Sequence, residues 1–300
     1  MRGLRHVPRN QKLTAGQLED TYTKLRGEAH SLSPQTVLHI HRALHTCHER
    51  ARRRKLIAVN VAGDAEPPKV PEEFDTTRLP SVERVQSFLD QLEQPVDGSK
   101  RRWRITSENR AFVRDLASLA IATGIRRGEM LALRWADVNL EAGTIRVGPA
   151  VEKSRAGLRV KRPKSDKPRL VAVPQSVCMQ LGAMQTRQKE QWLALGVRPE
   201  SEDEALLFAP SPDAPEALLS PAAASARFRD AADACGLKLH LHDLRHLHVS
   251  VLLKGLSVAE VSKRAGHANP AVTLRLYAHA LPDTEERQAQ AVDALLINRR

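Results

Sequence analysis

The chain has 300 residues, of which 41% are hydrophobic and 3% aromatic, and it carries a net charge of +12 with an isoelectric point near 10.0. This composition excludes wholesale disorder and predicts one large or two ordinary domains with a core of Leu, Val, Ile and Ala. The positive charge favours a polyanionic partner, nucleic acid first, over a protein that merely happens to be basic.

Cysteine usage and the lack of long apolar runs predict a cytoplasmic protein. Cys47, Cys178 and Cys235 lie far apart and form no CxxC pair, which fits a reducing compartment. The first residues lack the apolar run of a secretory signal. No stretch of the sequence approaches the ~18 apolar residues that span a bilayer.

Residues 13–60 are predicted to be helical. Ser33-Pro34 is a helix-start signal, and an apolar stripe follows at helical spacing: Val37, Ile40, Leu44 and Cys47. The opposite side and the residues just beyond it are basic: His41, Arg42, His45, Arg50, Arg52, Arg53, Arg54 and Lys55. Such a face is either simply solvated or lies along a phosphate backbone. Arg42, His45 and the 52–54 triplet are therefore candidate DNA contacts.

The composition changes between residues 61 and 80. A glycine and four prolines, with mixed charges between them, predict an extended linker: Gly63, Pro67, Pro68, Pro71 and Pro80. We therefore expect a helical amino-terminal domain over residues 1–66, a linker over 67–80 and a second domain over 81–300.

Helical signals resume at Ser81. A further apolar stripe predicts a helix that Gly124 ends as a C-cap: Phe112, Leu116, Leu119, Ala120 and Thr123. A short helix follows through Met130 and Leu133. The period then changes to two, which predicts strands at residues 144–147 and 169–173. A basic loop is expected between them, with Lys161, Arg162, Lys164 and Lys167.

The remainder is predicted to be helical, which makes the fold mainly α with a small antiparallel β-sheet. Helices are expected over residues 175–195, from the Ser220-Pro221 cap to Gly236, over 242–254, from the Ser257 capping box to Gly266, and from Pro270 through Tyr277. The 242–254 helix would be anchored by Leu244, Leu247 and Val251. A last helix is expected over 283–298 after Pro282.

Residues suited to phosphodiester chemistry recur in order along the second domain. His242 and Arg245 are three apart and share a helix face, and Arg126 follows a helix-ending glycine. Two guanidiniums can grip the oxygens of a phosphate and stabilise the charge that develops in its transition state. Tyr277 would then be the nucleophile.

A tyrosine hydroxyl has a pKa near 10, so Tyr277 needs help at neutral pH. Nearby arginines favour the phenolate, and a histidine can accept the proton. The leaving oxygen needs a proton in return. Lys164, just before the second strand, is the best-placed donor, with Lys161 and Lys167 as competitors.

Each of these residues has a simpler interpretation when taken alone. Tyr277 would be a core residue, and His267 a helix-end residue. A zinc cluster of His240, His242, His246 and His248 is disfavoured, because no nearby carboxylate or cysteine completes the set and Arg245 would lie beside the cation. His246 and His248 are expected to be packing or surface residues.

The ordered set resembles the tyrosine recombinases of the phage-integrase type. The matching segments are residues 122–133 (ATGIRRGEMLAL), Lys164-Ser165, His242-x-x-Arg245, Gly266-His267 and Tyr277-x-His279. The resemblance covers about residues 30–285 and fills all six polar positions of the family's active site. Two departures are an amino-terminal part shorter by about one helix, and Arg264-Ala265 where a leucine commonly precedes Gly-His.

The resemblance implies a two-domain clamp around DNA and a site-specific DNA recombinase, an integrase that integrates or excises mobile DNA. Each implied role falls on a matched position. Tyr277 would form a 3′-phosphotyrosyl intermediate, while Arg126 and Arg245 clamp the phosphate and His267 hydrogen-bonds it. His242 would take part in acid–base transfer, Lys164 would protonate the leaving 5′-oxygen, and Glu129 would support the site from behind. Lys161 and Arg162 join the candidate DNA contacts. No metal, ATP or other cofactor is implied, because the covalent bond conserves the phosphodiester energy.

The resemblance also implies partners, and two alternative functions are considered beside it. The partner is double-stranded DNA with specific recombination sites, on which the protein would form a homotetramer whose last helix docks on a neighbouring protomer. DNA-bending or directionality factors would also take part. The protein would act at the nucleoid and not at a membrane. A type IB topoisomerase, acting as a monomer, is the nearest enzymatic alternative. A non-catalytic DNA-binding regulator is the alternative from another class.

Overall fold

The structure is a computed structural model that describes residues 13–70, 79–94, 106–162, 168–278 and 281. The chain divides into two compact units, Met1–Glu72 and Glu73–Arg300. The division falls inside the 67–80 segment that the sequence predicts as a linker.

The first unit is a small helical domain of α1 (Ala15–Arg26), α2 (Pro34–Arg53) and α3 (Val61–Asp64). Its core consists of Leu18, Tyr22, Val37, Ala62 and Ala65. The Tyr22 hydroxyl lies 3.1 Å from Nδ1 of His41, so this tyrosine is a packing residue with a satisfied polar tip. The sequence predicted extended chain from residue 61, which was wrong for Val61–Asp64. These residues form one helical turn, because Ala62 and Ala65 are buried in the core of this unit.

The basic face of α2 is exposed at Arg42, His45 and the 52–54 triplet. Glu49 pairs with Arg52 at 2.8 Å and with Arg53 at 3.2 Å. Cys47 is exposed, so the apolar stripe of α2 is narrower than its spacing predicted.

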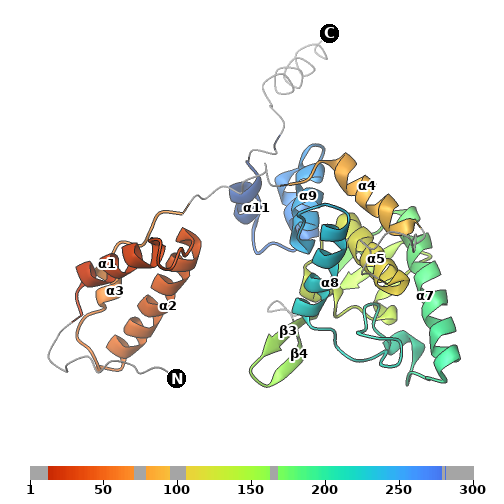
Figure 1. Cartoon of the computed structure of the whole chain (residues 1–300), viewed down its shortest axis with the longest axis horizontal. Coiled ribbons are helices and arrows are strands. Elements are labelled where there is room, and N and C mark those ends of the chain that lie inside the picture. The colour runs from red at the N-terminus through yellow and green to blue at the C-terminus, as the bar shows by residue number, and fades with distance from the viewer. Residues whose placement is uncertain (1–12, 71–78, 95–105, 163–167, 279–280, 282–300) are drawn as a thin grey trace, which may run out of the picture. The chain divides into compact units, whose positions relative to one another are not determined.

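The second unit is built around α5 (Ser107–Thr123), which packs chiefly against the long helices that surround it (Figure 1). These are α4 (Val82–Glu93), α7 (Gln175–Leu195), α8 (Pro221–Ala234) and α9 (Leu241–Leu253). Leu116, Leu119 and Ala120 of α5 are at most 1% exposed, which places the predicted stripe at the centre of the larger core. Short elements follow α5: α6 (Arg127–Met130), the 3₁₀ turn Trp135–Asp137 and, after α7, a second 3₁₀ turn, Glu202–Glu204.

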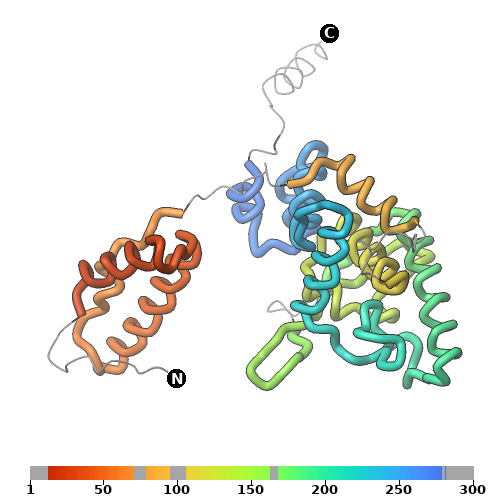
Figure 2. The backbone as a smooth tube through the Cα atoms, in the orientation of Figure 1, coloured from red at the N-terminus to blue at the C-terminus, as the bar shows by residue number. Residues whose placement is uncertain are grey.

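The sheet is small and antiparallel, with strand order β1 (Val138–Asn139), β2 (Thr144–Val147) and β5 (Arg169–Ala172). Ile145 faces Val171 in the pairing of β2 with β5. The predicted basic loop between these two strands was wrong in part, because β3 (Ala150–Ser154) and β4 (Gly157–Lys161) form a separate hairpin there. This hairpin projects from the helical body in Figure 2 and buries only Val151 fully, so it lacks the apolar alternation that predicts strands.

Three helices at the end of the described chain form their own core: α9, α10 (Val258–Ala265) and α11 (Pro270–Tyr277). Val249, Leu253, Val261, Ala265 and Tyr277 make up this cluster. In α9, Leu244 and Leu247 are buried as expected, but Val251 is 44% exposed and anchors nothing.

The helix expected over residues 283–298 lies outside the described residues, as do Lys164 and His279. Among the described helices, none is long and apolar enough to cross a membrane.

Candidate active site

The turn after α5 presents Arg126. Gly124 ends α5 in the left-handed region, with φ +61°, and its carbonyl accepts a hydrogen bond from the buried Arg245 guanidinium. Arg126 then caps α6: its backbone N–H donates to Oε2 of Glu129 at 2.8 Å, and its guanidinium donates to Oε1 at 3.2 Å. One glycine turn therefore positions both arginines.

Glu129 holds two arginines behind the site. Besides Arg126 it receives both guanidinium nitrogens of Arg169, at 3.1 and 2.8 Å, and it is only 7% exposed. Burial alone would raise the pKa of this carboxyl, but the hydrogen bonds and charge of Arg169, and then those of Arg126, outweigh burial and lower the pKa. Glu129 is therefore ionised at neutral pH.

The turn between α10 and α11 closes the site from the other side. Gly266 ends α10 with φ +69°, and its carbonyl accepts a 2.5 Å hydrogen bond from Arg126. A Cβ on Gly266 would lie 2.7 Å from Cζ of Arg169, so a side chain here would displace the Arg169 guanidinium. Because Gly266 has no side chain, the Arg169 guanidinium, which is paired with Glu129, can pack against the turn that carries His267.

Arg245 and His242 project from α9 at this place. Arg245 is 4% exposed, and burial, followed by repulsion from Arg126, lowers its pKa to about 10, so it remains charged at neutral pH. The side chain of His242 reaches solvent, yet partial removal from water and the charge of Arg245 lower its pKa. His242 is therefore largely neutral at pH 7 and able to accept a proton.

Tyr277 lies 1% exposed at the end of α11, and burial raises its pKa to about 12 although Arg245 lowers it. The ring of His267 is stacked on it, with centroids 6.5 Å apart. Nδ1 of His267 lies 2.6 Å from Oγ1 of Thr273, and burial lowers the pKa of His267 to about 4. Five of the six residues predicted as catalytic thus lie in one cluster: Arg126, His242, Arg245, His267 and Tyr277.

His246 also belongs to this cluster, although the sequence led us to expect a packing or surface residue. Its Nδ1 lies 2.5 Å from the Tyr277 hydroxyl, and its ring meets that of His242 edge to face, with centroids 4.7 Å apart. Position i+4 from His242 on one helix was a signal for this placement. In the sequence, the spacing of His242 and His246 was considered only as part of a possible zinc site.

Arg169 was not singled out by the sequence, and Arg264 was noted only as part of a departure from the family's pattern. Arg264 donates to the carbonyls of Ala122 and Ala172, at 2.8 and 2.9 Å, and thereby ties the end of α10 to α5 and β5. It also reaches His248, whose Nδ1 bonds the carbonyl of Ile121. Arg264, in the Arg264-Ala265 pair that precedes Gly266-His267, is therefore a structural link.

Gly124→Ala is expected to destabilise the second unit by about 2–4 kcal/mol, combining left-handed strain with overpacking. The added Cβ would lie 2.2 Å from Cδ2 of the buried His248. Urea unfolding measures the loss. The matched control is Gly236→Ala, because Gly236 has φ +72° and open space around it, so that variant carries strain alone, about 1 kcal/mol. Equal losses in the two variants would contradict the clash.

The predicted DNA-contact residues of the second unit lie on the hairpin. Lys161 is the last residue of β4 and pairs with Glu152 at 3.0 Å, and both Lys161 and Arg162 are exposed. Lys161 is thus a strand residue with a carboxylate partner.

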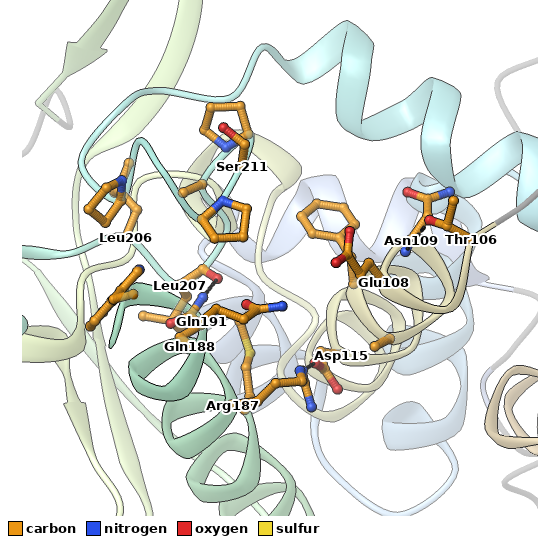
Figure 3. Close-up of a pocket in the computed structure, with 18 of the residues that line it drawn as sticks. Thr106, Glu108, Asn109, Asp115, Arg187, Gln188, Gln191, Leu206, Leu207 and Ser211 are labelled. Atoms are coloured by element: carbon orange, nitrogen blue, oxygen red, sulfur yellow. Dashed lines mark hydrogen bonds and ion pairs between the residues drawn. The ribbon is translucent and has the colours of Figure 1, made fainter. Parts of the chain in front are cut away.

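No group of three His, Cys, Asp or Glu side chains among the described residues could hold a metal. A hollow of about 600 Å³ lies between α5, α7 and residues 206–215 (Figure 3), and it contains none of the clustered residues. Its buried Asp115 is already paired with Arg187 and Arg114, and Arg227 donates to the carbonyl of Pro210.

The cluster is suited to transfer of a phosphoryl group to a tyrosine. Arg126 and Arg245 supply charge for a phosphate, His242, His246 and His267 are largely neutral, and Tyr277 supplies a hydroxyl. The sequence model of the phage integrase family matches residues 89–283, which contain all of these residues. The chain belongs to the phage integrase family.

Relatives known by sequence agree with this membership. The chain is 34% identical over 191 residues to a putative prophage phiRv2 integrase of Mycobacterium tuberculosis, covering 63% of this chain and 47% of that protein. It is 26% identical over 181 residues to the ICEBs1 integrase of Bacillus subtilis, covering 60% and 48%. The chain therefore spans about half the length of these relatives.

The fold is also that of solved integrases. The Tn1549 transposon integrase in complex with transposon right end DNA matches with a TM-score of 0.71 at 17% identity, over 94% of this chain and 86% of that one. A lambda integrase dimer bound to a COC′ core site matches with a TM-score of 0.56 at 17% identity, over 90% and 84%.

Proposed function

We propose that this protein is a tyrosine-type site-specific DNA recombinase that integrates or excises mobile DNA. The observation that carries the proposal is that Arg245 lies close to both Arg126 and Tyr277, and that burial has removed Tyr277 from bulk water. Membership of the phage integrase family and relatives named as integrases support it.

In the proposed reaction the Tyr277 oxygen attacks the scissile phosphorus. The bond from phosphorus to the 5′-oxygen breaks, which leaves a 3′-phosphotyrosyl bond and a 5′-hydroxyl. Arg126 and Arg245 hold the non-bridging oxygens and stabilise their added charge, and removing one such donor costs about 3–4 kcal/mol of barrier. His267 and His242 assist at the phosphate, and Lys164 protonates the leaving oxygen. Attack of a 5′-hydroxyl from a second duplex reverses the step, so no cofactor supplies energy.

The proposed substrate is double-stranded DNA with specific sites. Arg42, His45, Arg52, Arg53 and Arg54 on the first unit, and Lys161 and Arg162 on the second, are proposed to contact its backbone. We propose that residues 1–66 and 81–300 act as two DNA-binding domains joined by a linker. Assembly as a homotetramer on DNA, action at the nucleoid in the cytoplasm, and control by DNA-bending or directionality factors belong to the same proposal. The two Tn1549 and lambda structures named above are complexes with DNA, which supports this partner.

Covalent trapping tests the proposal. The protein is incubated with nicked duplexes tiled across the DNA that flanks its own gene, so that cleavage releases a short strand and traps the intermediate. We expect an adduct that survives denaturation, with the 3′-phosphate on the peptide containing Tyr277. Strand exchange between two such sites would separate a recombinase from a topoisomerase, which only relaxes supercoils. A protein that binds these duplexes but never forms an adduct would be a DNA-binding regulator, and the proposal would be wrong.

A further inference from the structure

The Tyr277 hydroxyl is held by a histidine outside the family's six polar positions. Nδ1 of His246 lies 2.5 Å from that hydroxyl, and the two ring centroids are 5.6 Å apart. His246 lies on α9 and Tyr277 at the end of α11, so the contact joins two helices of the same small core.

The direction of this hydrogen bond follows from the charge states. Burial raises the pKa of Tyr277 to about 12, and burial followed by repulsion from His242 lowers the pKa of His246 to about 4. At neutral pH the tyrosine is therefore protonated and the imidazole neutral. The hydroxyl donates and Nδ1 accepts, which requires the tautomer that carries its proton on Nε2.

The neighbouring histidines are engaged differently. Nδ1 of His267 is occupied by Oγ1 of Thr273 at 2.6 Å, and its ring stacks on the face of Tyr277. His242 packs against the His246 ring, closer to solvent. His246 is thus the histidine placed at the oxygen that must lose a proton.

We propose that His246 is a catalytic residue that takes the proton of Tyr277 during strand cleavage and returns it during rejoining. This inference rests on the proposed function. As the bond from the tyrosine oxygen to phosphorus forms, the O–H bond breaks and its proton passes to Nδ1, while the 5′-oxygen leaves with a proton from the general acid. In rejoining, the tyrosine oxygen is the leaving group, and Nδ1–H protonates it.

The surroundings make such a transfer reversible. His246 faces His242, Asp243 and Arg245 from its own helix, His267 from the turn between α10 and α11, and Tyr277 from α11. Arg245 opposes a lasting imidazolium, so the proton is easily returned. Transfer is driven by bond formation, because an oxygen bonded to phosphorus loses its basicity while negative charge grows on the phosphate.

His246→Asn is the decisive variant, because its amide oxygen can accept a hydrogen bond near the Nδ1 position but cannot take up the proton. Covalent adduct formation on the nicked flanking duplex is timed between about pH 6 and 9. The wild-type rate should be nearly flat. The variant should be slower by about 100-fold at neutral pH and should rise about tenfold per pH unit as the tyrosine ionises by itself. His240→Gln is the matched control, since His240 is an exposed histidine at the start of the same helix, and it should behave as wild type.

Each outcome decides between roles. A His246→Asn rate equal to wild type would show that only the hydrogen bond matters, and a slow rate with a flat pH profile would reduce His246 to a structural residue; either overturns the proposal. A duplex with sulfur as the bridging 5′-atom needs no general acid, so the variant should stay slow on it. Recovery on sulfur would assign His246 to the leaving group instead. If the wild type forms no adduct, the proposed function itself fails, which is a separate result.

Discussion

Tyr277→Phe is expected to abolish covalent cleavage of the flanking duplex, with a loss of more than about four orders of magnitude, because no other oxygen can form the phosphotyrosyl bond. The benzyl ring should stay in the core with Val249, Val261 and Ala265, so the protein should remain folded and bind DNA. Gel detection of the adduct and urea unfolding measure the two effects separately.

Tyr22→Phe is a matched control for this result. Tyr22 is also buried, and its hydroxyl also meets a histidine, at 3.1 Å from Nδ1 of His41. Both variants lose one buried hydroxyl worth about 1 kcal/mol of stability. Only Tyr277→Phe should lose cleavage. Covalent adducts formed by the phenylalanine protein would mean that another residue is the nucleophile.

The sequence predicted those parts of the site whose residues are set by local rules. Gly124 and Gly266 end helices because they adopt positive φ, and that same conformation brings their carbonyls to Arg245 and Arg126. Helical spacing likewise predicted that Arg245 and His242 share one face of α9 while Leu244 and Leu247 anchor that helix. Local signals of this kind survive folding, so the ends of α5 at Gly124 and of α10 at Gly266 were predicted correctly.

The sequence did not predict contacts made by residues distant in the chain. Arg169 was predicted only as a strand residue, because its partner Glu129 lies 40 residues away in the sequence. His246 was predicted to be a packing or surface residue, because its partner is 31 residues away on another helix. The β3–β4 hairpin was missed because charged pairs such as Glu152 with Arg159 replace an apolar pattern.

Glu129→Gln is expected to lower the stability of the second unit by about 2–4 kcal/mol, because removing one partner of a buried ion pair leaves the others uncompensated. Arg169, Arg126 and Arg245 would then share an uncompensated excess of positive charge. The loss falls in the lower part of the range for buried pairs, since the Arg126 side chain is 45% exposed. Cleavage should fall by about 100-fold, because Arg126 is no longer fixed. Glu152→Gln, which breaks an exposed cluster on the hairpin, should change neither quantity measurably.

The pH dependence of the difference in unfolding free energy between wild type and Glu129→Gln provides an independent test. The folded state lowers the pKa of the Glu129 carboxyl below its ordinary value of 4.5, so its contribution to stability is fully present above that value. As the pH falls through the lowered pKa, the carboxyl is protonated in both states and the contribution disappears. The gap in unfolding free energy between wild type and Glu129→Gln should therefore be constant from about pH 7 to 5 and narrow below about pH 4. The buried histidines titrate in both proteins and largely cancel in the comparison. A gap that stayed constant to the lowest pH at which both proteins fold would mean that Glu129 acts through its shape and hydrogen bonds, without its charge.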